Sequence, residues 1–208
     1  MKITWLGHAC FKIEKNGFEI VLDPYAPGSV PGYKDIRESA DLVLCSHEHG
    51  DHCAKEEVEL KKGKENPFTV SIIDSWHDDR QGALRGANRI TVLDDGEIRA
   101  VHMGDIGCAL NDRQLSALKG ADVLMIPVGG HFTIDAAQAK AMADEIGAKV
   151  VIPMHYSGKG FGYPVIGPVE NYTRLCRDVK VYDGSSLEVT PETVPQTAVL
   201  RPKNLRRV

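Results

Sequence analysis

The sequence predicts an α/β fold in which two β-sheets pack together and helices lie outside them. Three observations support this prediction. Short β-type segments cluster early in the 208-residue chain, strand–helix alternation dominates the later part, and no internal repeat or low-complexity linker separates the two parts. A chain of this length fits one domain or two tightly fused halves, and we expect one domain over residues 1–190.

The N-terminal part of the chain is predicted to form three short strands, which cover residues 2–6, 10–15 and 18–22. Asn16-Gly17 favours the tight turn of a hairpin between the last two strands. The third strand ends at Asp23-Pro24, because proline cannot continue the pairing. Asp23 could orient a neighbouring histidine or cap its own turn, and both interpretations remain open.

The following elements are predicted from apolar periodicity and from turn residues. A loop that leads into a short helical turn covers residues 25–40. Strands are expected at residues 41–46, 68–73, 88–93, 97–103, 121–127, 149–153, 179–182 and 187–189. Helices are expected at residues 54–64, 111–118, 135–146 and 171–176. Residues 191–208, which include Arg201, Lys203, Arg206 and Arg207, are expected to form a loose basic tail, with a binding arm as the alternative.

Composition excludes several classes of protein. Hydrophobic content of 42% and charged content of 26% are typical of a globular protein, and the net charge of −4 gives no general nucleic-acid signature. The sequence has no apolar signal core and no stretch near the roughly 20 apolar residues of a membrane span. Five scattered cysteines without a CxxC motif favour free thiols and a cytoplasmic location. Cys53 could bind metal, but a packing role beside the ligands is the favoured interpretation.

The sequence H-E-H-G-D-H at residues 47–52 directly follows a predicted buried strand. Side chains two positions apart in an extended chain point the same way, so His47 and His49 could bind one ion together. Gly50 permits a sharp turn that aims Asp51 and His52 toward a second ion. Imidazole and carboxylate donors suit zinc, and also iron or manganese. The alternative is a polar loop whose histidines bind nothing.

Other polar residues recur where predicted strands end, and one folded edge could gather them. We therefore expect two ion sites. The first comprises His47, His49 and His77, and the second comprises Asp51, His52 and His155. Asp105 could bridge the two ions through its two carboxylate oxygens.

Further histidines are candidates with less defined roles. His8 could be a ligand, but a structural or pocket-edge role is favoured, and His102 is expected to be structural. His131 could protonate the leaving group or bind an oxyanion, or it could simply pack a loop. Arg85 and Asn88 could line the pocket, although we favour a role in the turn that positions His77. Asp78 and Asp79 could fix the tautomer of that histidine or cap a turn.

These motifs carry a family resemblance that covers roughly residues 2–190. H-x-H-x-D-H at residues 47–52, with His77, Gly104-Asp105 and the segment 153–156 (P-M-H-Y), resembles the metallo-β-lactamase fold superfamily of metallo-hydrolases. Gly7-His8, Asp23-Pro24, R-G-x-N at 85–88 and G-G-H-F-T at 129–133 are similar to its short bacterial and archaeal branch. That branch includes ascorbate-6-phosphate lactonases and uncharacterised metal-dependent hydrolases.

The resemblance implies a four-layer αββα sandwich with the site along one edge of the β core. It also implies that Asp105 is the bridging ligand, near the position where drug-resistance β-lactamases use a cysteine. Two cations close together could share a hydroxide, because a bound cation lowers the pKa of water from about 15.7 toward about 7. Asp51 could orient that hydroxide, and no nucleophilic serine or cysteine is required.

We therefore expect a metal-dependent hydrolase of a small ester, lactone or phosphodiester, with two divalent ions as cofactors. Zinc is the first choice, and manganese or iron is the alternative. A nuclease, a di-iron oxidoreductase and a non-catalytic metal-binding protein are the competing functions. The expected partner is a small-molecule substrate, with no membrane and no nucleic acid, and a homo-oligomer is left open.

Overall fold

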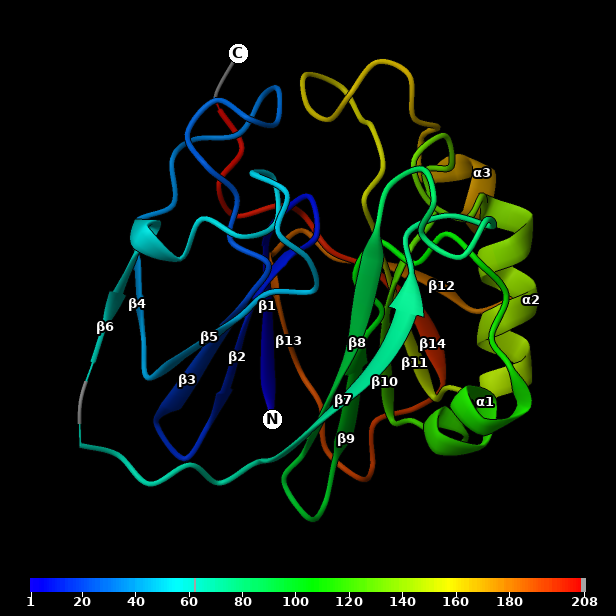
Figure 1. Cartoon of the computed structure of the whole chain (residues 1–208). Helices are drawn as coiled ribbons and strands as arrows, with labels where there is room; N and C mark the ends of the chain where they lie inside the picture. The colour runs from blue at the N-terminus through cyan, green and yellow to red at the C-terminus, as the bar shows by residue number, and fades with distance from the viewer. Residues whose placement is uncertain (62, 207–208) are drawn as a thin grey trace.

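The structure is a computed structural model that describes residues 1–61 and 63–206. Four strands from the N-terminal part of the chain and one from near its C-terminus form a five-stranded sheet with the strand order β13-β1-β2-β3-β5 (Figure 1). The strands are β1 (Lys2–Gly7), β2 (Cys10–Lys15), β3 (Phe18–Leu22), β5 (Leu42–Leu44) and β13 (Ser186–Glu188). The predicted hairpin at Asn16-Gly17 joins β2 to β3, and β5 then pairs with β3 in parallel.

A seven-stranded sheet with the order β12-β14-β11-β10-β9-β8-β7 lies against the first sheet. Its strands are β7 (Thr69–Trp76), β8 (Ala87–Asp94), β9 (Arg99–His102), β10 (Val123–Pro127), β11 (Val150–Met154), β12 (Val179–Val181) and β14 (Gln196–Val199). Only β8 is antiparallel to its neighbours. The carboxyl ends of the parallel strands therefore share one edge of the sheet.

The helices are α1 (Asp112–Leu118), α2 (Ala136–Ile146) and α3 (Glu170–Thr173), and they lie on the outer face of the seven-stranded sheet (Figure 1). Capping boxes begin α1 and α2: Asn111 and Asp135 each accept a hydrogen bond from the backbone of the third helical residue. Gly147 ends α2 in the left-handed conformation, as predicted. None of the described helices has the length and apolar character needed to cross a bilayer.

The core has two parts. The larger part fills the space between the sheets and under the helices, and residues such as Trp5, Ile90 and Met125 are wholly buried there. The smaller part covers the other face of the five-stranded sheet, where Tyr25, Tyr33 and neighbouring apolar residues pack. The predicted layered sandwich is present. Its fourth layer is made by the segment that contains Tyr25 and Tyr33, together with a small sheet of β4 (Glu38–Ala40) and β6 (Val58–Leu60).

Two predicted elements were wrong. Residues 54–64 do not form an exposed helix. A single 3₁₀ turn, η1 (Lys55–Glu57), leads into β6, and residue 62 lies outside the described residues. Residues 191–208 are not a loose tail, because β14 inserts between β11 and β12. Beyond β14, Arg206 donates hydrogen bonds to the backbone oxygens of Gly32 and Tyr33, and Arg207 lies outside the described residues.

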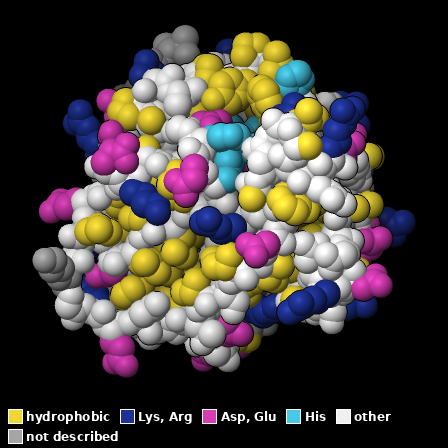
Figure 2. Space-filling view, viewed as in Figure 1, with side chains coloured by type: hydrophobic (Ala, Val, Ile, Leu, Met, Phe, Trp, Pro, Cys, Tyr) yellow, Lys and Arg dark blue, Asp and Glu magenta, His cyan; other side chains and the backbone are white. Residues whose placement is uncertain are grey.

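The predicted gathering of strand ends is confirmed. His8 follows β1, Asp23 follows β3, and the motif at residues 47–52 follows β5 in the first sheet. His77, Asp105, His131 and His155 follow β7, β9, β10 and β11 in the second sheet. These ends lie at the upper edge of the two sheets in Figure 1, and histidine side chains reach the surface in the same part of the molecule in Figure 2.

Candidate metal centre

The seven predicted ligands converge, and they do so in two groups. In the outer group, His47, His49 and His77 each bring a ring nitrogen within 4.8 Å of the others. His47 and His77 are buried, whereas His49 is exposed. The strand β5 delivers the first two residues, and β7 of the other sheet delivers the third.

The inner group consists of Asp51, His52, His155 and His8, again with ligand atoms within 4.8 Å of one another. His8 was predicted to be structural or at the pocket edge. It is wholly buried, its Nε2 atom lies 3.5 Å from Asp51 Oδ2, and its ring centroid lies 4.1 Å from that of His155. The geometry therefore puts His8 among the donors of this group.

Asp105 lies between the two groups. Its Oδ2 atom is 3.1 Å from His52 Nε2 and 3.1 Å from His155 Nε2, both in the inner group. The same oxygen is 3.4 Å from His77 Nε2 in the outer group. A single buried carboxylate thus approaches both groups, which is the position that a bridging ligand requires.

Burial and charge shape the ionisation of these groups. Burial would raise the pKa of the Asp105 carboxyl, but the charges of His155 and His52 hold it well below its ordinary value. Burial, together with the charge of His52, lowers the pKa of His47 to about 3. Burial and the charge of His155 lower the pKa of His8 to about 3 as well. Neutral imidazoles and an ionised carboxylate are the forms that bind metal ions.

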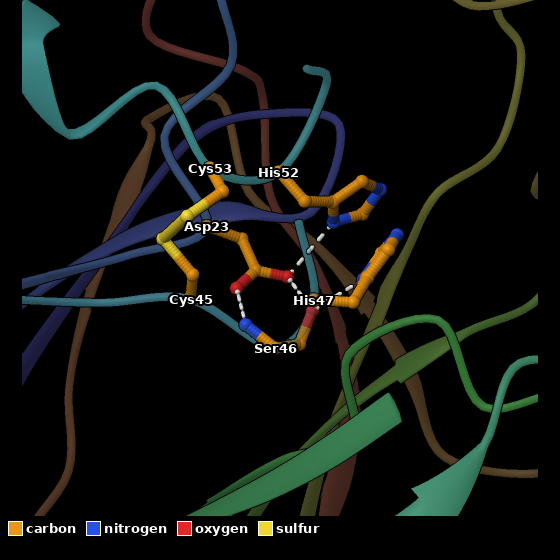
Figure 3. Close-up of a disulfide and its surroundings, with 6 residues drawn as sticks. All are labelled: Asp23, Cys45, Ser46, His47, His52 and Cys53. Carbon is orange, nitrogen blue, oxygen red and sulfur yellow. Dashed lines mark hydrogen bonds and ion pairs between the residues drawn. A yellow bond between two sulfur atoms is a disulfide. The ribbon is translucent and has the colours of Figure 1, made fainter. Parts of the chain in front are cut away.

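Asp23 holds the metal loop by three hydrogen bonds, which Figure 3 shows. It accepts from the backbone N–H of Ser46 at 2.7 Å, from Ser46 Oγ at 2.5 Å and from His52 Nδ1 at 2.8 Å. Because an ionised carboxylate only accepts, His52 carries its proton on Nδ1. The Ser46 hydroxyl donates its only proton to Asp23. His47 Nδ1 must therefore be the donor in its 2.9 Å hydrogen bond to Ser46 Oγ.

In both histidines Nδ1 is thus engaged, and Nε2 is the ring nitrogen left to bind a metal ion. Among the described residues, neither His47 Nε2 nor His52 Nε2 has a hydrogen-bond partner, although both atoms are buried. The two ring nitrogens of His8 are likewise buried without a partner in the described part of the chain. Buried polar atoms in native proteins are almost always satisfied. A donor set of imidazole nitrogens and carboxylate oxygens, aimed at common centres, fits divalent metal ions of the zinc type.

Asn88 and Gly104 position Asp105. The buried Asn88 accepts from the backbone N–H of Asp105 at 2.9 Å and donates to the backbone oxygen of Met103 at 2.9 Å. Gly104 has φ of 56°, and a Cβ atom there would overlap Asn88 and Ser46. Asn88 does not line the pocket, and it acts instead on the backbone that presents the carboxylate. His102 is structural, as predicted, with Nε2 donating to the backbone oxygen of Ala9 at 2.8 Å.

Backbone strain is concentrated at this edge. Six non-glycine residues among those described have positive φ, and four of them are candidate site residues: His8, Asp23, His131 and His155. Such conformations cost about 1–3 kcal/mol each and persist where the surroundings enforce them. The sequence gives no sign of this feature.

A disulfide between Cys45 and Cys53 brackets the metal loop (Figure 3). Their Cα atoms are 5.3 Å apart, and the eight-residue separation encloses all four ligands of the motif. The prediction of free thiols is therefore wrong for these two residues, and neither the ligand role nor the simple packing role weighed for Cys53 describes it. Cys10, Cys108 and Cys176 are free. The cysteines consequently no longer argue for a reducing compartment.

A pocket of about 340 Å³ opens onto both groups of ligands. Its lining includes His49, His77, Asp51, Asp105 and His155, together with Arg85, Phe132 and Tyr163. Tyr163 was missed in the sequence. Its hydroxyl lies 3.2 Å from Asp51 Oδ2 and 2.9 Å from the backbone oxygen of Ser29. Burial, followed by the charge of Asp51, raises the pKa of this phenol, so it remains a donor.

His131 is exposed and is not among the residues that line this pocket. Its ring meets Phe132 edge-on, and its backbone oxygen accepts a hydrogen bond from Arg85. Its part in catalysis stays a prediction. Asp78 caps the turn after His77, where it accepts from four backbone N–H groups.

Comparison with known proteins agrees with this geometry. The family described as "Beta-lactamase superfamily domain" matches residues 2–155. A UPF0173 metal-dependent hydrolase of Hyperthermus butylicus is 30% identical in an alignment that covers 79% of this chain and 85% of that protein. A UPF0173 metal-dependent hydrolase of Carboxydothermus hydrogenoformans is 28% identical, over 76% of this chain and 85% of its own length.

A crystal structure from Thermotoga maritima, assigned to the metallo-β-lactamase superfamily, superposes with a TM-score of 0.73 at 30% identity. It covers 96% of this chain and 97% of its own. The chain belongs to the β-lactamase superfamily, as its motifs predicted. Within that superfamily it is a metal-dependent hydrolase.

Proposed function

We propose that the chain binds two divalent metal ions, zinc by preference and manganese or iron as alternatives, and hydrolyses a small ester, lactone or phosphodiester. The observation that carries this proposal is the position of Asp105, whose Oδ2 atom approaches His77 of the outer group and His52 and His155 of the inner group. His47, His49, His77 and Asp105 would hold one ion. Asp51, His52, His155, His8 and Asp105 are the donors for the other.

Bound ions would supply a water of lowered pKa and positive charge for the oxyanion that develops during hydrolysis. The chain's own residues prepare the site for this chemistry. Burial would raise the pKa of Asp51, but the His8 imidazole at 3.5 Å and the charge of His52 keep it below its ordinary value, so the ionised carboxylate can orient a water by accepting a hydrogen bond from it. The Tyr163 hydroxyl lies 3.2 Å from Oδ2 of that carboxylate and can donate its proton either to it or to the backbone oxygen of Ser29.

The competing nuclease function loses support. The basic C-terminal residues that would have formed an RNA-binding arm are tied to the fold, since Lys203 pairs with Glu38 and Arg206 bonds to Tyr33. The seven-stranded sheet includes β14, so the C-terminal segment is part of the core structure. The small pocket also suits a small molecule better than a polymer.

The test combines metal analysis with a substrate screen. Freshly purified protein should contain about two metal equivalents, and loading with zinc, manganese or iron should give hydrolysis of a member of a lactone, thioester and phosphodiester panel. His131→Ala is the matched control, since it removes an exposed histidine of the same edge and should retain both ions. Fewer than two equivalents at saturation, or full occupancy without hydrolysis of any substrate class, would overturn the proposal.

A further inference from the structure

Among the residues that line the pocket, Arg85 is the cation, and within the described part of the chain it has no anionic partner. It is half-buried, and it lines the same pocket as His49 and His77. Within the described residues, the ion pairs involve lysines and histidines, and Arg85 takes part in none of them. A guanidinium is charged at physiological pH, and its charge and its remaining N–H donors are therefore available to an anionic ligand in the pocket.

The side chain of Arg85 is not needed for its own turn. That turn, residues 78–86, is held by the Asp78 carboxylate, which accepts hydrogen bonds from backbone N–H groups including that of Arg85 itself at 2.8 Å. The role favoured from the sequence, stabilising the turn that positions His77, is therefore performed by Asp78. The guanidinium is left for another purpose.

Two contacts fix the guanidinium instead at the pocket. It lies over the ring of Phe132, with Cζ 5.8 Å from the ring centroid. Its Nη2 atom donates to the backbone oxygen of His131 at 3.3 Å. A guanidinium has five N–H donors in a planar fork, so most remain for a ligand. Both contacts come from the loop after β10, and together they hold the fork at the pocket wall.

The rest of the wall defines the body of the ligand. Phe132 also meets Tyr163 edge-on at 5.7 Å, so an aromatic surface extends from Arg85 toward Asp51. The carboxylates of the pocket are already engaged: Asp105 lies among imidazoles, and Asp51 contacts His8 and Tyr163. The cavity of about 340 Å³ is at the small end of ligand sites.

We infer that Arg85 binds an oxyanion substituent, a carboxylate or a phosphoryl group, of a small substrate whose apolar body lies against Phe132 and Tyr163. This inference rests on the proposed function and names the substrate class within it. It places the anion at one end of the pocket and the bond to be hydrolysed beside the ligand groups. A bidentate guanidinium–oxyanion pair provides orientation as well as affinity.

The test measures binding rather than turnover, using benzoate, phenylphosphonate and the neutral analogue benzamide with metal-loaded protein in a calorimeter. Arg85→Met should weaken the binding of benzoate or phenylphosphonate by about 10- to 100-fold, because it removes the charged hydrogen bonds and keeps the apolar stem. Arg85→Lys should recover part of this loss. Benzamide should be unaffected by either substitution, and metal content should equal that of the wild type.

The pattern of losses decides between the anion sources. If Arg85→Met loses only benzoate binding, the substrate's oxyanion is a carboxylate, and if it loses only phenylphosphonate binding, the oxyanion is a phosphoryl group. Weaker binding of both probes supports the shared oxyanion chemistry. Equal binding of all three probes by wild type and Arg85→Met would overturn the inference, since the anions would then be held by the metal ions alone. Failure of the proposed function appears separately, as missing metal or missing hydrolysis in the wild type.

Discussion

The outer and inner ligand groups differ in how they are enclosed and supported. In the inner group His8, His52 and His155 are at most 1% exposed, and Asp23 locks His52 from behind. The outer group ends in the exposed His49 at the pocket. An enclosed, hydrogen-bonded site is preorganised, whereas an open one exchanges its ligands with water. If both groups bind ions, we expect the ion of the inner group to exchange more slowly than the ion of the outer group.

The largest expected effect comes from Asp105→Asn, which acts on both groups at once. The substitution removes the negative charge that lies beside three imidazoles and replaces one carboxylate oxygen with an amide NH2 group that cannot bind a cation. We expect both metal equivalents to be weakened and hydrolysis to fall by more than about 100-fold. Metal content by mass spectrometry and kcat/KM would measure this. Retention of two tightly bound ions would contradict the bridging role.

The second prediction separates the groups. His155→Ala should weaken the inner ion by more than about 100-fold, because water cannot easily replace a ligand at a position that is 1% exposed. His49→Ala should weaken the outer ion by only about 10-fold, because solvent can occupy the vacated position. Competition with a chromogenic chelator would give both affinities. If the two substitutions had equal effects, the distinction between the groups would be lost.

The third prediction concerns support from behind the ligands. Asp23→Asn removes the acceptor that keeps the proton of His52 on Nδ1 and replaces it with an amide that can donate. Metal affinity should fall about 10- to 100-fold with the fold intact. Asp122→Asn is the matched control. Asp122 also accepts a hydrogen bond from a backbone N–H, but it directly precedes β10, at the end of that strand away from the candidate metal site. A similar loss in the control would indicate a general effect on folding.

The fourth prediction concerns the disulfide. Replacing Cys45 and Cys53 together by serine releases the short loop that holds the four motif ligands, and the chain-entropy estimate for such a loop is about 2–3 kcal/mol. Denaturant unfolding should show a loss of about this size, and metal affinity should fall with it. Cys108→Ser, which alters a free cysteine, should change neither quantity appreciably. Unchanged stability in the double variant would show that Asp23 and Ser46 suffice to hold the loop.

Much of the site could be predicted from the sequence because it obeys a simple rule. Parallel strands end at one edge, so His77, Asp105 and His155 could be placed together before any contact was known. The turn residues also predicted the hairpin at Asn16-Gly17 and the end of α2 at Gly147. These features depend on residue types at neighbouring positions, which can be read directly from the sequence.

The elements that were missed depend on distant partners. β14 is a strand because β11 and β12 flank it, and β6 overrides the helical propensity of its charged residues because it pairs with β4. The disulfide required Cys45 and Cys53 to approach within bonding range across the loop, which scattered spacing does not reveal. Tyr163 could have been suspected from the glycine-rich loop after His155, but its contact with Asp51 is a property of the fold.

The smallest expected effect concerns pH and tests the burial of the inner group directly. His8 has an ordinary pKa of 6.5 and a folded pKa of about 3, so the unfolded chain takes up a proton between these values that the folded chain does not. The depressed pKa of His8 therefore stabilises the folded state above pH 6.5, and this stabilisation is lost progressively as the pH falls. In metal-free protein the cost at pH 5 is about 2 kcal/mol relative to pH 7.

His47 acts in the same direction, since its pKa is also lowered to about 3. His52 has a raised pKa, because the attraction of Asp105 overcomes burial, so its stabilising contribution grows as the pH falls through 6.5 and offsets only part of the loss from the other two histidines. Urea unfolding of metal-free protein between pH 7 and pH 5 should therefore show falling stability, and His8→Asn should flatten the slope. Constant stability over this range would mean that His8 is solvated rather than enclosed, and the contrast between the inner and outer groups would lose its physical basis.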